Sequence, residues 1–260
     1  MNAAPGVRLE CRNVRKEYRR TTAVRDASFA VEAGARVGIV GESGSGKSTM
    51  VKIIMGVEHA TSGSVTIDGQ DVRTLLSTRQ GRLDYRRRVQ LVAQDTTTTF
   101  DPRRTVRDAL RTPAQILGGH DRRGADEAVD AIAGELEIDL RLIDRYPSEL
   151  SGGQRQRMSI ARALVVRPGL LVCDEAVSAL DVSVQGTVLN LLKRYSLEHG
   201  AGLLFVSHGL PATSFLTSEL VVMRAGEVVE AGRTRELIES PRHPYTAHLV
   251  SAYTALETAG

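Results

Sequence analysis

The sequence predicts an α/β fold in which a buried strand, a glycine-rich loop and a helix follow one another directly. Residues 36–40 form a short apolar run rich in β-branched side chains, which is typical of a buried strand. Residues 41–49 fit the phosphate-loop pattern G-x-x-x-x-G-K-[ST], and residues 50–55 continue as an apolar helix. Other apolar runs, at 88–93, 169–173 and 203–206, predict further strands of the same sheet.

The loop at 41–49 has the residues of a phosphate-binding nest. Its glycines let the backbone aim successive N–H groups inward, and the helix N-terminus adds partial positive charge. Lys47 can reach the outer phosphates of a nucleoside triphosphate, and Ser48 offers a hydroxyl to Mg²⁺. The alternative is a plain glycine-rich turn, but the full pattern arises by chance in a chain of this size with a probability below about one in a hundred. The residues expected to line the nest are Gly41, Ser43, Gly44, Gly46, Lys47, Ser48 and Thr49.

The bulk composition is that of a soluble globular protein. The 260 residues suffice for one large α/β domain or two small ones, and 25% charged residues with a net charge of +3 do not demand nucleic acid or a membrane. No apolar run approaches the roughly 18 residues of a membrane span, and the N-terminus lacks a signal-peptide stretch. Cys11 and Cys173 lie in strand-like runs, which favours buried reduced thiols in a cytosolic protein. Any attachment to a membrane is expected to come from other chains.

The remaining elements follow in order along the chain. Alternating apolar residues predict antiparallel strands near 7–11, 28–31 and 64–69, around the phosphate-loop strand. Helical spacing and turn residues predict a basic helix at 74–87, a polar loop from 95 to 102, a helical stretch to about 146 with a break at Gly118-Gly119, a helix opening at Ser151, a helix at 181–199, a β-hairpin over 219–231, and helices at 233–239 and 244–257.

Four further positions suggest chemistry, each with a bland alternative. Tyr18 could stack on a nucleotide base or simply pack at a strand end. The segment Leu150 to Gln154 could form a second anion site at a helix start, capped by Ser151. Asp174 and Glu175 end an apolar strand, where an acid can hold the Mg²⁺ shell and its neighbour can polarise water, although an acidic turn is the alternative. His208 could bond a γ-phosphate, or it could be structural.

Together these segments resemble the nucleotide-binding subunit of an ABC transporter. The resemblance is carried by the phosphate loop, Gln94 after a strand, LSGGQ at 150–154, the strand 170–175 and His208, and it covers nearly the whole chain. It implies a P-loop NTPase fold of the ABC type, with a mixed sheet, an antiparallel β subdomain and an inserted helical subdomain. Residues 1–94 and 166–232 would form the catalytic core, 95–165 the helical subdomain with the signature, and 233–260 a C-terminal helical extension.

The resemblance also implies roles for individual residues. Tyr18 would stack on adenine, Lys47 and the loop amides would hold the phosphates, and Ser48 and Gln94 would bind Mg²⁺ with Asp174 in its outer shell. Glu175 would be the general base and His208 the γ-phosphate sensor. In a head-to-tail dimer, Ser151, Gly153 and Gln154 would serve the partner's nucleotide, and Asp181 would make a contact across the dimer.

Finer similarity indicates the oligopeptide, dipeptide and nickel importer branch. It rests on 100–106, 173–185 and above all His-Pro-Tyr-Thr at 243–246. Such ATPases bind ATP and Mg²⁺ at the cytoplasmic face of the plasma membrane, as a pair beneath two permeases and an extracellular binding protein. Some carry an iron-sulfur centre on C-terminal cysteines, but no cysteine follows Cys173, so none is expected here. The alternatives are nickel import or an ATPase of a soluble complex such as carbon-phosphorus lyase.

Three positions depart from the usual pattern of this family. Ala176 stands where proline commonly follows the glutamate, and Gly209 stands where aspartate commonly follows the histidine. The loop 95–99 replaces a Glu/Pro-containing version with Asp-Thr-Thr-Thr-Thr. None of these changes removes a catalytic side chain, but the loop lies where the family engages its permeases, so the choice of partner is expected to be unusual.

Overall fold

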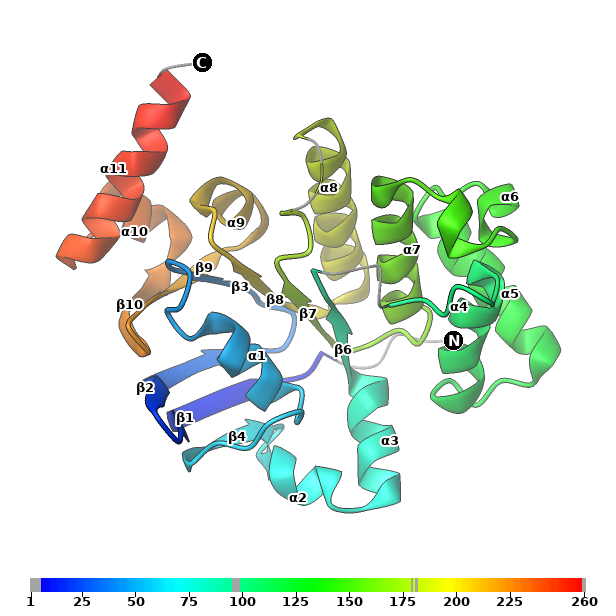
Figure 1. The fold of residues 1–260 in the computed structure, drawn as a ribbon, viewed down its shortest axis with the longest axis horizontal. Helices are drawn as coiled ribbons and strands as arrows, with labels where there is room; N and C mark the ends of the chain where they lie inside the picture. The colour runs from blue at the N-terminus through cyan, green and yellow to red at the C-terminus, as the bar shows by residue number, and fades with distance from the viewer. Residues whose placement is uncertain (1–5, 95–98, 179, 181, 259–260) are drawn as a thin grey trace.

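One ten-stranded sheet runs through the protein, in the order β5-β4-β1-β2-β10-β9-β3-β8-β7-β6 (Figure 1). The structure is a computed structural model that describes residues 6–94, 99–178, 180 and 182–258. The polar loop at 95–98 and the predicted interface residue Asp181 therefore lie outside the described residues.

The half of the sheet that carries the phosphate loop is parallel. Its strands are β3 (Arg36–Val40), β6 (Val89–Val92), β7 (Leu170–Asp174), β8 (Gly202–Ser207) and β9 (Glu219–Arg224). Each of these strands pairs in parallel with its neighbours in this set. Because the carboxyl ends of parallel strands meet at one edge of the sheet, the residues that follow β3, β6, β7 and β8 gather there.

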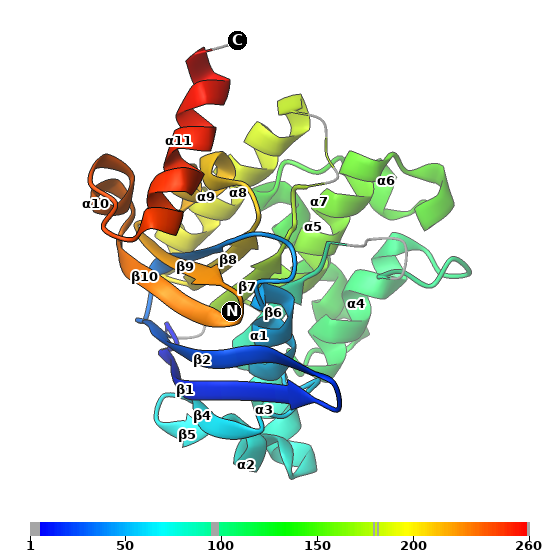
Figure 2. The same ribbon diagram turned by 60° about the vertical axis from the view of Figure 1, so that its left-hand side comes forward.

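The other half of the sheet is largely antiparallel, as the alternating pattern predicts. It contains β1 (Leu9–Tyr18), β2 (Thr21–Val31), β4 (Ser62–Ile67), β5 (Gln70–Asp71) and β10 (Glu227–Arg233). Strand β10 joins the two halves, since it pairs antiparallel with β9 and parallel with β2. Figure 2 shows β1, β2 and β4 below the parallel strands.

The helices surround this sheet. Helices α4 to α7 lie together at the right of Figure 1, whereas α10 and α11 lie at the left, beside β10. The helices are α1 (Lys47–Ile54), α2 (Val72–Leu76), α3 (Arg79–Arg88), α4 (Val106–Ile116), α5 (Arg122–Glu135), α6 (Leu140–Ile143), α7 (Gly152–Leu164), α8 (Val182–His199), α9 (Leu210–Leu216), α10 (Thr234–Glu239) and α11 (Pro244–Thr258), with a short 3₁₀ turn at Pro147–Glu149.

Two helix predictions need correction. The single helix expected at 74–87 is wrong, because the chain breaks between α2 and α3. Thr78 caps the second of these helices, its side chain accepting a hydrogen bond of 3.0 Å from the Gly81 N–H. Helix α9 has no counterpart among the predicted elements, and it begins directly after His208 and Gly209.

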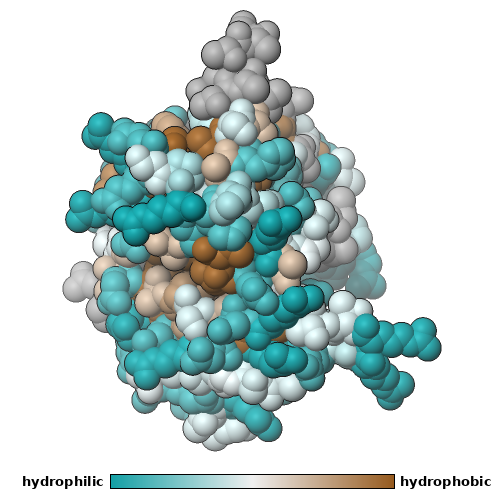
Figure 3. All heavy atoms as spheres, turned by 90° about the vertical axis from the view of Figure 1, so that its left-hand side faces the viewer, coloured by the Kyte–Doolittle hydropathy of each residue, from teal (hydrophilic) through white to brown (hydrophobic). Residues whose placement is uncertain are grey.

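Three apolar clusters hold the layers together. The largest joins helices α4, α5, α7 and α8 to the sheet, and the second packs α1 between the two halves of the sheet. The third lies under the C-terminal helices and contains Val40, Leu210, Leu220, Val222, Leu237 and Tyr245. The face at the left of Figure 1 is mostly hydrophilic, with limited apolar areas (Figure 3).

The cysteines and the helices of the described residues bear on the expected compartment and on membrane insertion. Cys11 and Cys173 are buried free thiols in β1 and β7, as predicted. Within the part of the chain that the structure describes, every helix is too short or too polar to span a bilayer.

Gly38 allows α9 to pack closely on β3, and this contact predicts a large effect of a single methyl group. A Cβ atom at position 38 would lie 2.2 Å from Thr213 Cγ2, so Gly38→Ala should push α9 away and lower the free energy of unfolding by about 1–3 kcal/mol. Gly186→Ala in α8 is the matched control, because nothing lies within 4 Å of its added carbon, and it should be neutral or stabilising by up to about 1 kcal/mol. Denaturant unfolding measures both, and equal stability of the two variants would contradict this packing.

Candidate active site

The phosphate loop between β3 and α1 needs glycine at two crowded positions. Gly46 has a φ of 103°, and an added Cβ atom would lie 2.6 Å from the Ala23 carbonyl oxygen. At Gly41 the same atom would lie 2.1 Å from the Met223 carbonyl oxygen. Any side chain here would displace the backbone of β2 or β9, so the glycines are what allow the loop to lie against the sheet.

Lys47 is buried at the centre of this loop, with only 6% of its surface exposed. Its ammonium donates to the carbonyl oxygens of Gly41 at 2.7 Å and Glu42 at 2.8 Å. Burial lowers the pKa of Lys47, and the carboxylates of Glu175 and Asp174 oppose that effect. The lysine is therefore electrostatically coupled to the acids that end β7, although those acids are far away in the sequence.

Asp174 has the surroundings of an incomplete cation site. Its Oδ1 atom is buried and has no hydrogen-bond partner among the residues that the structure describes. Burial raises its pKa, the neighbouring Glu175 raises it further, and Lys47 opposes both effects. A buried carboxylate oxygen without a partner fits Mg²⁺, which prefers oxygen ligands and commonly keeps part of its water shell.

Glu175 adopts a backbone conformation that non-glycine residues rarely take. Its φ is 49°, and its N–H donates to the Val206 carbonyl oxygen of β8 at 2.8 Å. This left-handed conformation turns the chain out of β7 immediately after Asp174. It costs of the order of 1 kcal/mol, and such strained conformations cluster at active sites although they also occur in turns.

Gln94 and His208 converge on Glu175 from the ends of β6 and β8. His208 Nδ1 lies 3.4 Å from Glu175 Oε1. Gln94 Nε2 donates to Ser178 Oγ at 3.2 Å, and that hydroxyl donates to the Glu175 carbonyl oxygen at 3.0 Å. Ser178 thus links Gln94 to Glu175, a role that sequence analysis missed although it lies only three residues after the glutamate.

Tyr18 ends β1, is 43% exposed as a residue, and has its hydroxyl in a hydrogen bond. The hydroxyl donates to the carboxylate of Glu58, which also lies 3.2 Å from the Lys16 ammonium. The hydrogen bond to Glu58 raises the pKa of Tyr18, so the phenol stays neutral. The Lys16 ammonium lies 5.0 Å from the ring centroid, leaving exposed ring surface for another flat group. Glu58, which follows α1, is a second residue that sequence analysis missed.

The segment at 150–154 begins α7 with a capping box. Ser151 Oγ accepts a hydrogen bond from the Gln154 N–H at 3.2 Å, and Gln154 Oε1 accepts one from the Ser151 N–H at 2.9 Å. Ser151 and Gly152 are exposed, whereas a Cβ atom on Gly153 would lie 3.0 Å from Val184 Cγ1. Figure 1 shows α7 in the right half of the view and α1, which starts at the phosphate loop, in the left half. This helix start is therefore open to solvent, and α7 lies apart from α1 in this view.

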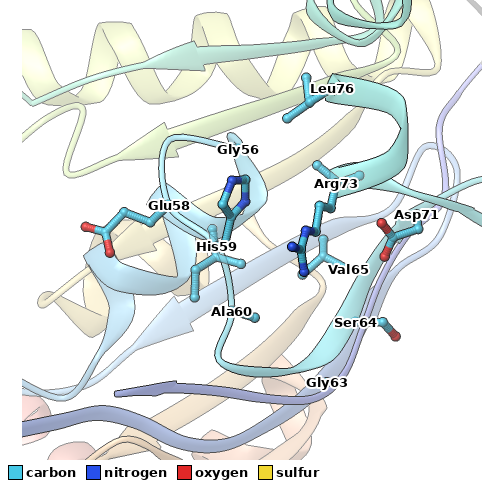
Figure 4. A pocket seen from close by; sticks show the side chains of 12 residues that line it. Gly56, Glu58, His59, Ala60, Gly63, Ser64, Val65, Asp71, Arg73 and Leu76 are labelled. Carbon is cyan, nitrogen blue, oxygen red and sulfur yellow. The ribbon is translucent and has the colours of Figure 1, made fainter. Parts of the chain in front are cut away.

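Two of the cavities in the described part of the chain lie outside this edge of the sheet, close to α1 and α3. One, of about 250 Å³, lies near the end of α1, where His59 and Arg73 lie side by side and Glu58 points away from them (Figure 4). The Asp71 carboxylate beside it already caps α2 by accepting from the Thr74 N–H. The other, of about 460 Å³, lies between α3, β6, α4 and α7 and is lined mainly by apolar side chains, among them Met55, Leu83, Leu91, Pro113, Ile116 and Leu117.

A ten-stranded mixed sheet, a phosphate loop with a buried lysine, and carboxylates at the adjoining strand end define an ATPase of the ATP-binding cassette class. The family model described as ABC transporter matches residues 24–178. The chain belongs to this family.

Relatives and solved structures agree with that assignment. A probable peptide ABC transporter ATP-binding protein of Sinorhizobium fredii is 42% identical over 88% of this chain and 65% of its own length. The oligopeptide transport ATP-binding protein OppF of Lactococcus lactis is 38% identical over 90% of this chain and 73% of its own. The ATP-binding cassette MJ0796, solved as a dimer bound to ADP and Pi after hydrolysis, superimposes with a TM-score of 0.79 at 27% identity, over 87% of this chain and 99% of that one.

Because the Asp174 carboxylate is buried, removing its charge is expected to stabilise the metal-free chain. Its native pKa is raised above the ordinary value, so the ionised form weakens the metal-free fold at neutral pH, and this cost disappears as pH falls through the native pKa. Asp174→Asn should therefore melt at a higher temperature than the parent near pH 7 without Mg²⁺, and the difference should shrink as pH falls towards 4. Thermal melts across this range, without metal, measure it. A parent that is the more stable protein at pH 7 would contradict the prediction.

Proposed function

We propose that this chain is the ATP-binding and ATP-hydrolysing subunit of an ABC importer that takes up peptides across the cytoplasmic membrane. The observation that carries the proposal is the meeting of Lys47, Asp174, Glu175 and His208 at one edge of the sheet, while the helix start at Ser151 faces solvent elsewhere. The phosphate-loop edge and the exposed start of α7 would each supply part of a nucleotide site. This suits a pair of subunits in which the α7 start of one completes the phosphate-loop site of the other.

ATP and Mg²⁺ fit the groups at this edge. The exposed face of Tyr18 would receive the adenine ring, and the amides of 41–49 with the Lys47 ammonium would hold the β- and γ-phosphates. Ser48 and Gln94 would bind Mg²⁺ directly, and Asp174 would hold its outer shell, which gives the unpartnered Oδ1 atom an electrostatic role. When bound, the ion would neutralise part of the charge on the phosphate oxygens.

Glu175 is the proposed general base. Its carboxylate would accept a proton from a water molecule that attacks the γ-phosphorus, while the bond to the β–γ bridging oxygen breaks and ADP leaves. The unusual backbone conformation of Glu175 and the contact of its Oε1 atom with His208 Nδ1 at 3.4 Å support a positioned carboxylate. His208 would sense the γ-phosphate from the end of β8.

A second ATPase subunit, identical or homologous, would complete each site. Its Ser151, Gly153 and Gln154 would present a helix N-terminus to the γ-phosphate bound by this chain. The exposure of Ser151 and Gly152 supports this assignment, and Asp181, outside the described residues, is proposed to contact the partner across the interface. The dimeric state of the cassette MJ0796 supports a pair of subunits.

Two permeases are the proposed membrane partners, and they would hold the chain at the cytoplasmic face of the membrane. The apolar cavity between α3, β6, α4 and α7 supports this. Thr99 and Ile116 both line the cavity, Thr99 lies at the end of the loop that the family uses for permeases, and Ile116 is 62% exposed. Peptides as cargo rest on the names of the relatives from S. fredii and L. lactis. An extracellular binding protein that delivers them is proposed from the resemblance to the importer branch.

Replacing the proposed base separates hydrolysis from binding. Glu175→Gln keeps the shape of the side chain but cannot take a proton, so ATP turnover in the assembled complex should fall by a factor of about 100 or more, while Mg²⁺-ATP binding persists. Glu198→Gln is the matched control, because Glu198 is an exposed glutamate of α8, and it should leave turnover unchanged. Undiminished hydrolysis by the Glu175→Gln complex would remove Glu175 from the role of base.

Co-purification from native cells tests the transport assignment. The tagged chain should bring down two membrane permeases, and Ile116→Asp should reduce their recovery by placing a charge in the apolar cavity. Leu197→Asp is the matched control, since Leu197 is 61% exposed on α8 and does not line that cavity. Recovery of soluble lyase subunits in place of permeases would contradict the importer and favour the alternative complex.

A further inference from the structure

The His-Pro-Tyr-Thr segment at 243–246 ties the start of α11 to the sheet. The Glu230 carboxylate of β10 accepts hydrogen bonds from the backbone N–H groups of Arg242 at 2.9 Å and His243 at 3.1 Å. His243 Nδ1 in turn accepts one from the Tyr245 N–H at 3.1 Å. Pro244 occupies the first position of the helix, where an N–H would have no acceptor within the helix. These bonds determine where the next residue, Tyr245, projects.

The Tyr245 ring is buried, with 4% of its surface exposed, in the cluster under the C-terminal helices. The Arg224 guanidinium lies over the ring, 5.0 Å from its centroid. Two other members of the cluster border the active site, since Val40 directly precedes the phosphate loop and Leu210 follows His208 by two residues. Tyr245 thus occupies a rigid position next to the nucleotide-binding edge.

The hydroxyl of Tyr245 reaches the phosphate loop. Its Oη atom accepts a hydrogen bond of 2.9 Å from the Glu42 N–H, which belongs to the same peptide group as the Gly41 carbonyl. That carbonyl accepts the 2.7 Å bond from the Lys47 ammonium. Because the N–H and C=O of a trans peptide point in opposite directions, the group is held at both ends, and rotating it would break both bonds.

We propose that Tyr245 is a positioning residue of the nucleotide site: its hydroxyl fixes the Gly41–Glu42 peptide and, through the Gly41 carbonyl, the Lys47 ammonium. The inference rests on the proposed role of Lys47 in binding phosphates. A loop that is already ordered loses less conformational freedom when nucleotide binds, so the hydroxyl raises nucleotide affinity. Burial raises the pKa of Tyr245 and keeps the phenol neutral, which suits this bond. The C-terminal helix thereby acts on a loop 203 residues away in the sequence.

Tyr245→Phe tests this inference, because it removes the hydroxyl and keeps the packed ring. The control is Tyr85→Phe, which also removes a buried hydroxyl bonded to the backbone, although this hydroxyl donates to the Ile54 carbonyl oxygen at the other end of α1. Mg²⁺-ATP affinity is measured on the isolated chain, KM and kcat on the assembled complex, and amide hydrogen exchange at Glu42. Tyr245→Phe should weaken binding and raise KM by about three- to tenfold, the range of one hydrogen bond, with kcat within about twofold and faster exchange at Glu42.

The outcomes separate this inference from the proposed function. A parent chain that binds no ATP would overturn the proposed function itself. A parent that binds ATP, with a Tyr245→Phe variant of equal affinity, would overturn only the positioning role. The same conclusion would follow if Tyr85→Phe weakened binding equally, or if Tyr245→Phe failed to fold, because the hydroxyl would then act through stability. Weaker binding by Tyr245→Phe alone, with the melting temperature retained, supports the inference.

Discussion

The ammonium of Lys47, buried inside a loop of backbone dipoles, is the charge on which the rest of the structure depends. The Gly41 and Glu42 carbonyl oxygens accept hydrogen bonds from this ammonium, and the carboxylates after β7 oppose the lowering of the Lys47 pKa by burial. The parallel order of β3, β8, β7 and β6 makes this possible, since it brings the loop, the two acids, His208 and Gln94 to one edge.

The site contains several energetically unfavourable features before any ligand binds. Asp174 keeps an unpartnered buried oxygen, Glu175 holds a left-handed backbone conformation, and the Lys47 pKa is lowered by burial. Each of these features weakens the fold of the isolated chain, and each would be relieved or used when a triphosphate and a divalent ion arrive. The phosphate loop is held from outside as well, by β2 and β9 against its glycines and by Tyr245 against Glu42.

Local patterns made much of this molecule predictable. The phosphate loop, the strand ending at Asp174 and the cap at Ser151 depend on residues within a few positions of one another, and the structure contains each as an element of the expected type. Prediction from the sequence failed at 74–87, because Thr78, the cap that begins α3, lies inside the expected helix. It missed α9, whose first turn contains a proline and whose later residues include Thr213 and Ser214 rather than strong helix formers.

Contacts between distant residues could not be predicted from the sequence. The pairing of Tyr18 with Glu58 spans 40 residues and that of Glu42 with Tyr245 spans 203, and neither has a local signature.

The central claim, that Lys47 and Asp174 serve one Mg²⁺-ATP, is tested most directly by a double-mutant cycle on Mg²⁺-ATP affinity with Lys47→Ala and Asp174→Asn. One shared site predicts that the two losses are coupled by about 0.5–3 kcal/mol, whereas strictly additive losses would mean that the two residues act on separate ligands.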